Sequence, residues 1–135
     1  DPNKDAFGRT KNGIPNRPVA AELHRAGIDV RWCNTQGEQC HSKMLLKRSM
    51  YNSEIILGSA NFTARNLKNY NLETNLRVVG HANAKVFTDA TQYFERAWHN
   101  QDGQKHSVDY AQYADESTLK YVLYRVMEWT GLSTF

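Results

Sequence analysis

The stretch HSKMLLKRSMYNSEIILGSANFTARNLKNYNLETNLRV, residues 41–78, decides the fold of this chain. It starts with an HxK triplet and continues as an extended run to residue 48. A polar turn over residues 49–53 separates that run from an apolar one, residues 54–58, which we expect to be a strand buried on both faces. Two extended runs joined by a short polar turn predict a β-hairpin.

The HxK triplet is the first candidate for chemistry. Residues two apart on a strand face the same side, so we expect His41 and Lys43 to point together. Lys43 can hold the non-bridging oxygens of a phosphate ester as their charge grows, and His41 can act as nucleophile or general acid. The triplet alone is a weak indication, because a surface histidine beside a surface lysine is common.

A second motif, Gly58-Ser59-Ala60-Asn61, follows one hairpin later. Gly58 permits a tight turn or a close backbone approach. The Ser59 hydroxyl and the Asn61 amide are donors that can reach the oxygens of a bound phosphoryl group. The same residues would also suit a turn that caps the next helix. The spacing of the two motifs by one hairpin favours phosphate binding.

Outward from this stretch, apolar periodicity predicts a succession of helices and strands. We expect helices over residues 17–26, 83–99 and 115–129, with Asp115 as the N-cap of the last. We expect further strands over residues 28–32 and 73–79, and loops over residues 1–16, 34–39 and 101–115. This order predicts an α/β fold, a mixed β-sheet flanked by helices, with residues 1–135 forming a single lobe.

Composition sets limits on the class of protein. The chain has 135 residues, of which 40% are hydrophobic and 23% charged, as expected for one globular domain or part of one. It contains no apolar run of roughly 18 residues, the length of a membrane-spanning helix. The chain opens on a loop-like segment without an initiator methionine, so we expect a fragment of a larger protein.

Charge and cysteine content leave two alternatives each. Residues 1–80 hold twelve Lys and Arg against seven Asp and Glu, a net charge of +5. This excess suits an anionic substrate, although the charge alone favours an ordinary solvated surface. Cys33 and Cys40 are too few for a structural zinc site and form either a disulfide or two free thiols.

Residues 41–78 resemble the phospholipase D superfamily, whose signature is HxK, then an Asp, then GSxN. The match is close over residues 58–63 and extends to Asn71-Leu72-Glu73, where the family places an acidic residue against the catalytic histidine. Two features depart from the pattern. Arg48 stands where the family usually has its Asp, and the hairpin is longer than the common form, since His41 and Ser59 lie eighteen residues apart.

The resemblance implies a phosphodiesterase or phosphatidyltransferase that works through a phosphohistidine and brings two HxK motifs together. The N-terminal half of the same protein, or a second copy of the chain, would supply the other motif. It implies the catalytic residues His41, Lys43, Asn61 and Glu73, with Glu73 orienting His41. It implies Lys43, Ser59 and Asn61 as ligands of the substrate phosphate, with no metal and no cofactor.

The sequence leaves the substrate open. A phospholipid or another phosphodiester is the first expectation, with a membrane surface as partner. The alternatives are a nuclease of the same superfamily, with nucleic acid as partner, and a catalytically degenerate half that only binds phosphate, which Arg48 favours. Hydrolysis and transfer both remain open, as does the role of His41 as nucleophile or general acid. We expect a location in the cell envelope, at a membrane or outside the cell rather than in the cytoplasm.

Overall fold

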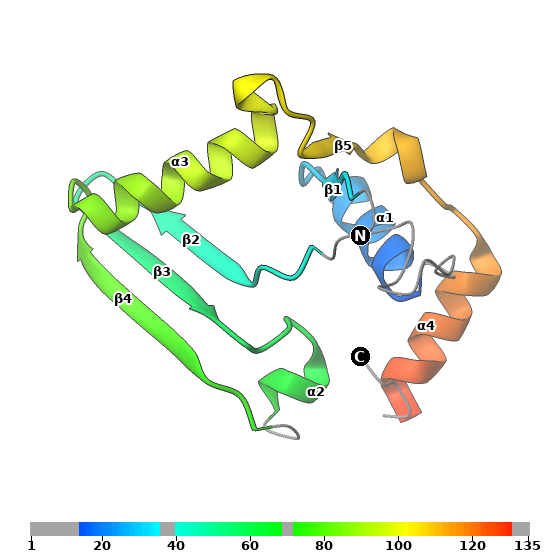
Figure 1. The fold of residues 1–135 in the computed structure, drawn as a ribbon. Coiled ribbons are helices and arrows are strands. Elements are labelled where there is room, and N and C mark those ends of the chain that lie inside the picture. Colours follow the sequence, from blue (N-terminus) through cyan, green and yellow to red (C-terminus); the bar gives the residue numbers. More distant parts are fainter. Residues whose placement is uncertain (1–13, 36–39, 69–71, 131–135) are drawn as a thin grey trace. The chain divides into compact units, whose positions relative to one another are not determined.

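The computed structural model describes residues 14–35, 40–68 and 72–130 (Figure 1). These residues fall into two compact units. We call His41–Arg96 the sheet unit, and the described residues of Asp1–Cys40 and Ala97–Thr134 the terminal unit. That the whole chain forms one lobe stays a prediction.

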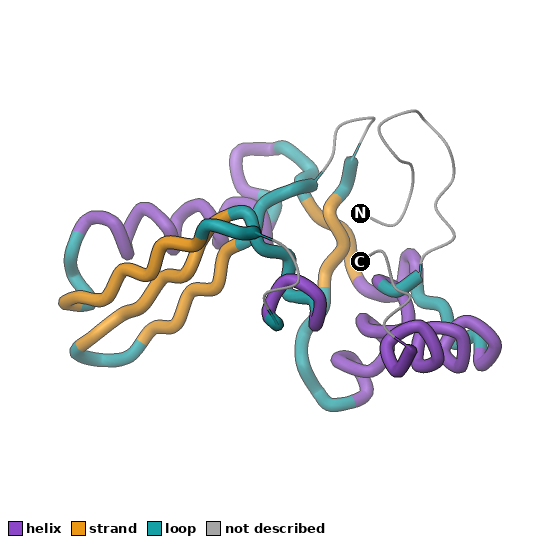
Figure 2. The backbone as a smooth tube through the Cα atoms, turned by 90° about the horizontal axis from the view of Figure 1, so that it is seen from below, coloured by secondary structure: helices purple, strands orange, loops and turns teal. Residues whose placement is uncertain are grey.

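The sheet unit is built on the predicted hairpin, which is confirmed. Strands β2 (Met44–Arg48), β3 (Asn52–Gly58) and β4 (Asn75–His81) form an antiparallel sheet in the order β2-β3-β4 (Figure 2). The turn between β2 and β3 is closed by Ser49, whose amide donates to the Asn52 carbonyl at 3.0 Å. The first strand starts at Met44 rather than at residue 41, so the HxK triplet precedes the strand instead of opening it.

Helix α3 (Lys85–His99) covers one face of this sheet. Phe87 is 2% exposed, and a Cβ at Gly80 on β4 would lie 3.2 Å from its ring. Ser53 pairs with Gly80 and Ile55 with Val78, so the buried residues of β3 lie on this face.

The opposite face of the sheet is open. Leu45 and Val79 are exposed there, because strand residues alternate between faces and α3 packs against the other face. The prediction that residues 54–58 are buried on both faces is therefore wrong. Leu57 is 40% exposed and Ile56 is only half-buried.

The terminal unit contains a second, smaller sheet. Strand β1 (Arg31–Cys33) pairs antiparallel with β5 (Ser107–Asp109), and Trp32 and Val108 pack with Ala20 of α1 (Asn16–Arg25). Strand β5 lies within the loop predicted over residues 101–115, because three residues carry too little alternation to predict a strand. Two 3₁₀ helices, η1 (Gln101–Gly103) and η2 (Tyr110–Tyr113), flank β5. The predicted α/β class is confirmed, and every strand pair among the described residues is antiparallel.

The last helix, α4 (Thr118–Thr130), has a different N-cap from the one predicted. The helix begins at Thr118, so Ser117 occupies the cap position, and its Oγ accepts from the Lys120 amide at 3.4 Å. Asp115 instead accepts from the Ser117 amide at 3.0 Å and pairs with Lys120 and Arg17. The hydrogen bond from Lys120 is the main cause that holds the pKa of Asp115 below its usual range. None of the helices in the described segments is long and apolar enough to cross a membrane.

The two cysteines form a disulfide. Cys33 at the end of β1 is bonded to Cys40, with 6.2 Å between the two Cα atoms. Of the two alternatives that the sequence left open, the structure has the bridge. Cys40 immediately precedes His41, so the bridge fixes the chain at the residue before the HxK triplet.

Breaking this bridge should lower stability. The cysteines are seven residues apart, and closing a loop of that size stabilises a protein by about 2–3 kcal/mol on the chain-entropy account. We expect a matching loss in the free energy of unfolding, measured by urea denaturation with and without reductant. The Cys33→Ser/Cys40→Ser protein is the control and should not respond to reductant. Two reactive thiols in the folded, unreduced protein would contradict the bridge.

Candidate active site

Three segments of the chain meet at one end of the three-stranded sheet. The antiparallel register pairs Met44 with Leu57 and Gly58 with Asn75. The residues before β2, after β3 and before β4 therefore lie at the same end (Figure 1). These residues are the HxK triplet, the Gly58-Ser59-Ala60-Asn61 motif and the segment that contains Glu73.

The HxK triplet lies at the solvent-facing start of β2. His41 is exposed and Lys43 is half-buried. The Lys43 Nζ donates a hydrogen bond of 2.7 Å to the His41 carbonyl oxygen. Both residues precede the strand, so strand geometry does not make their side chains point to the same side. This contact nevertheless holds the ammonium beside the backbone of the histidine.

Gly58 makes a close backbone approach, which is one of the two roles that its residue type permits. A Cβ at this position would lie 2.2 Å from the Thr74 carbonyl oxygen and 2.7 Å from the Asn75 Cα. Only a residue without a side chain allows the end of β3 to run this close to the start of β4. Gly58 therefore brings the GSxN motif against the segment that contains Glu73.

Ser59 is bonded to this neighbouring segment. Its hydroxyl donates to Glu73 Oε2 at 2.5 Å and accepts from the Thr74 amide at 3.0 Å. Its own amide donates to the Thr74 carbonyl at 3.0 Å. Both donors of Ser59 are thus engaged within the protein, and its contact with a substrate phosphate stays a prediction.

Asn61 is exposed at the tip of the motif. Its carbonyl accepts from the Thr63 amide at 2.8 Å. Its side-chain amide has no hydrogen-bond partner among the residues that the structure describes. The amide is therefore a donor available to a bound oxyanion, as its predicted role requires.

Glu73 is half-buried, and both of its carboxylate oxygens are hydrogen-bonded. Oε2 accepts from the Ser59 hydroxyl, and Oε1 accepts from Asn66 Nδ2 at 2.5 Å. Neither contact involves His41, so the predicted orientation of His41 by Glu73 stays a prediction. Asn66 belongs to neither sequence motif; it lies on the short helix α2 (Ala64–Leu67) and reaches Glu73 only in the folded chain.

Arg48, at the position of the family's usual Asp, lies away from these residues. It is the last residue of β2, where it pairs with Ser53, whereas Lys43 precedes the first. Five residues of strand span about 17 Å. Arg48 is also exposed, so its charge does not act on the HxK triplet, the GSxN motif and Glu73 at the other end of the sheet.

The three segments carry an imidazole, an ammonium, a side-chain amide and a carboxylate at the same end of the sheet. An ammonium and an amide can hold phosphate oxygens, and an imidazole can attack phosphorus or pass a proton. A single histidine can perform only one of these two steps, the attack on phosphorus or the proton transfer. Within the described residues, no three His, Cys, Asp or Glu side chains are grouped to hold a metal ion.

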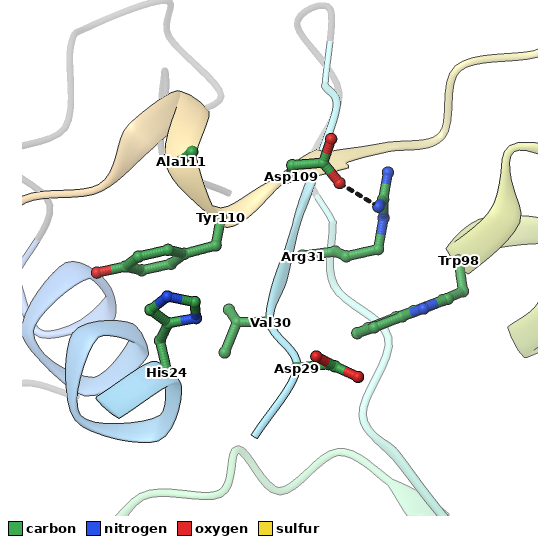
Figure 3. A pocket seen from close by; sticks show the side chains of 8 residues that line it. All are labelled: His24, Asp29, Val30, Arg31, Trp98, Asp109, Tyr110 and Ala111. Atoms are coloured by element: carbon green, nitrogen blue, oxygen red, sulfur yellow. Dashed lines mark hydrogen bonds and ion pairs between the residues drawn. The ribbon is translucent and has the colours of Figure 1, made fainter. Parts of the chain in front are cut away.

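The terminal unit has a separate hollow of about 350 Å³, drawn in Figure 3. On one side the His24 ring stacks on Tyr110 with 4.1 Å between centroids, and Trp98 lies across from them. The Arg31 guanidinium is paired with Asp109. His24 is exposed on helix α1, and its ring stacks on that of Tyr110. None of the residues of the three segments lines this hollow.

Comparison with known families identifies one match. The model of the family described as "Cardiolipin synthase, PLD-like domain" matches residues 3–98. This range contains the HxK triplet, the GSxN motif and Glu73. No curated protein and no solved structure matches the chain.

Proposed function

The chain belongs to the cardiolipin synthase, phospholipase D-like domain family, and from this premise we propose that it is one catalytic lobe of a metal-independent phosphodiesterase or phosphatidyltransferase. The observation that carries the proposal is the register of the β2-β3-β4 sheet. It brings the HxK triplet, the GSxN motif and Glu73 to one end of one sheet.

The proposed reaction is a double displacement at phosphorus. One imidazole attacks phosphorus, a phosphorus–nitrogen bond forms, and the bond to the leaving alcohol breaks. A second imidazole gives its proton to the departing oxygen. It then takes a proton from water or from an acceptor alcohol, whose oxygen displaces the first imidazole. The products are a phosphate monoester after hydrolysis and a new phosphodiester after transfer.

His41 supplies one of these two imidazoles. Lys43 and Asn61 bind the non-bridging oxygens and stabilise the charge that grows on them in the transition state. Glu73 accepts a hydrogen bond from the His41 ring and so selects which ring nitrogen faces the substrate. The second histidine comes from another HxK motif, in the N-terminal half of the same protein or in a second copy of this chain.

The proposed substrate is a phospholipid. A nuclease needs a long basic surface for the polyanion, and the net charge of +5 over residues 1–80 is small for that purpose. The degenerate-half alternative rested on Arg48, and the position of Arg48 at the far end of β2 weakens it. The Cys33–Cys40 disulfide supports a location in an oxidising compartment, such as the cell envelope or the exterior.

Hydrolysis of bis-p-nitrophenyl phosphate in excess EDTA tests the proposal. We expect turnover to persist in EDTA, because Lys43 and Asn61 supply the positive charge and the donors that a metal would otherwise provide. The chain is assayed alone over a range of concentrations and together with an N-terminal half that carries a second HxK motif.

The concentration dependence identifies the source of the second HxK motif. A rate per chain that rises with concentration indicates a second copy. Turnover only in the presence of the N-terminal half indicates that this half supplies the motif. Loss of turnover in EDTA would contradict the proposed chemistry. No turnover in any form, on this substrate or on phospholipid vesicles, would favour the degenerate half.

A further inference from the structure

Asn66 is a buried polar residue next to the proposed catalytic group. It is 7% exposed, although asparagine usually lies at the surface. Its Nδ2 donates to Glu73 Oε1 at 2.5 Å, and its Oδ1 accepts from the Thr63 hydroxyl at 3.1 Å. An ionised carboxylate only accepts hydrogen bonds, so the amide nitrogen must be the end that faces Glu73.

The Glu73 carboxylate is held from two sides. Ser59 donates to one oxygen from the end of β3, and Asn66 donates to the other from α2. Donors on two different elements fix both the position and the plane of the carboxylate. A carboxylate has about four acceptor sites, so two donors leave room for a third.

A carboxylate suits residue 73 because it accepts hydrogen bonds on two separate oxygens. A glutamine at this position would offer one acceptor oxygen and one donor NH₂ group, so it could not accept from both Ser59 and Asn66 in this arrangement. The two donors leave acceptor sites of the Glu73 carboxylate unused. The sheet register brings His41, whose ring carries an N–H donor, to the same end of the sheet.

We propose that Asn66 is a positioning residue that, with Ser59, fixes the Glu73 carboxylate to orient the His41 ring. Thr63 supports this arrangement, because its hydroxyl sets the direction of the Asn66 amide. The inference rests on the proposed function for the role of His41. It extends the site to a residue that does not touch the substrate.

The substitution Asn66→Asp tests this role with almost no change in volume. It replaces the donor with a second carboxylate, which repels Glu73. We expect kcat of the active form to fall by about 10- to 100-fold, as for other residues that orient a catalytic ligand. We expect KM to change little, because Lys43 and Asn61 still bind the phosphate. Asn52→Asp, an exposed substitution at the far end of β3, is the matched control and should leave both constants unchanged.

The exchange Asn66→Asp/Glu73→Gln separates positioning from folding. The exchanged pair again joins one amide to one carboxylate, so the melting temperature should recover towards that of the native protein. Turnover should stay low, because the carboxylate now sits at residue 66. Recovery of kcat together with stability would show a merely structural role and overturn the proposal.

A spectroscopic measurement keeps this inference separate from the proposed function. The ¹⁵N signals of the His41 ring report which nitrogen carries the proton, and they are assigned by their loss in His41→Gln. We expect Asn66→Asp to change these signals and to leave those of His81 unchanged. If the His41 signals change in Asn66→Asp but no form of the protein shows turnover, the proposed function is wrong and the positioning role of Asn66 stands. If the protein is active but Asn66→Asp changes neither the His41 signals nor kcat, the positioning role of Asn66 is wrong and the proposed function stands.

Discussion

The His41→Ala substitution should lower the turnover of a phospholipid by at least about 10³-fold in the active form of the protein, because groups that act as one catalytic unit cannot replace one another. The reaction needs one imidazole as nucleophile and another as proton donor, and His41 is the only histidine in an HxK triplet of this chain. The rate of alcohol release from vesicles in excess EDTA measures the effect. Binding of the intact substrate should change much less, since Lys43 and Asn61 are unaltered.

His81→Ala is the matched control for this experiment. His81 is an exposed histidine at the far end of β4, and its Nδ1 accepts from the Asn83 amide at 3.3 Å. It belongs to the same unit as His41 but lies at the opposite end of the sheet. Its loss should leave turnover unchanged. If the two variants retained equal activity, His41 would have no part in the chemistry.

The leaving group distinguishes the two roles of His41. A nucleophile is needed for every substrate, so its loss should affect bis-p-nitrophenyl phosphate and a phospholipid alike. A proton donor matters most for an alcohol, because p-nitrophenolate departs without protonation. A loss in His41→Ala that is much smaller on the p-nitrophenyl ester than on the phospholipid would therefore identify His41 as the general acid.

The hairpin and its motifs could be predicted because their signals are local. The apolar run around Ile55, the polar turn before it and the two motifs at its ends all lie within one short stretch, which is enough to define an antiparallel pair. The position of Gly58 against the next strand also follows from its residue type. The sequence thus predicted that the two motifs lie at the same end of the hairpin.

The features that the sequence did not predict depend on contacts between distant residues. Asn66 is one asparagine among many, and only the fold of α2 brings its amide to Glu73. Ser117 and Asp115 are both good N-cap residues, and the sequence does not show that Asp115 pairs with Lys120 and Arg17 while Ser117 caps α4. The exposure of the opposite face of the β2-β3-β4 sheet could not be foreseen, because an apolar residue such as Ile56, which pairs with Leu45 on that face, does not show whether a helix covers it.

The Gly58→Ala substitution should destabilise the sheet unit by about 3–5 kcal/mol, since overpacking against backbone and the loss of hydrogen bonds add together. The new Cβ would lie 2.2 Å from the Thr74 carbonyl oxygen, and backbone cannot yield as a flexible side chain does. To relieve the contact, the start of β4 must move away from β3. That movement breaks the hydrogen bonds that join Ser59 to Thr74 and Glu73.

Gly80→Ala provides the comparison, because Gly80 is a glycine of the same sheet at its other end. A Cβ at Gly80 meets only the Phe87 ring, at 3.2 Å, and a small shift of that side chain relieves the contact. We expect a change of about 1 kcal/mol or less, partly offset by the lower backbone entropy that alanine gives the unfolded chain. Urea denaturation of the two variants measures the difference. The movement that destabilises Gly58→Ala should also release Glu73 and so abolish turnover. If the two variants were equally stable, β3 and β4 would not approach each other at Gly58 as closely as 2.2 Å requires.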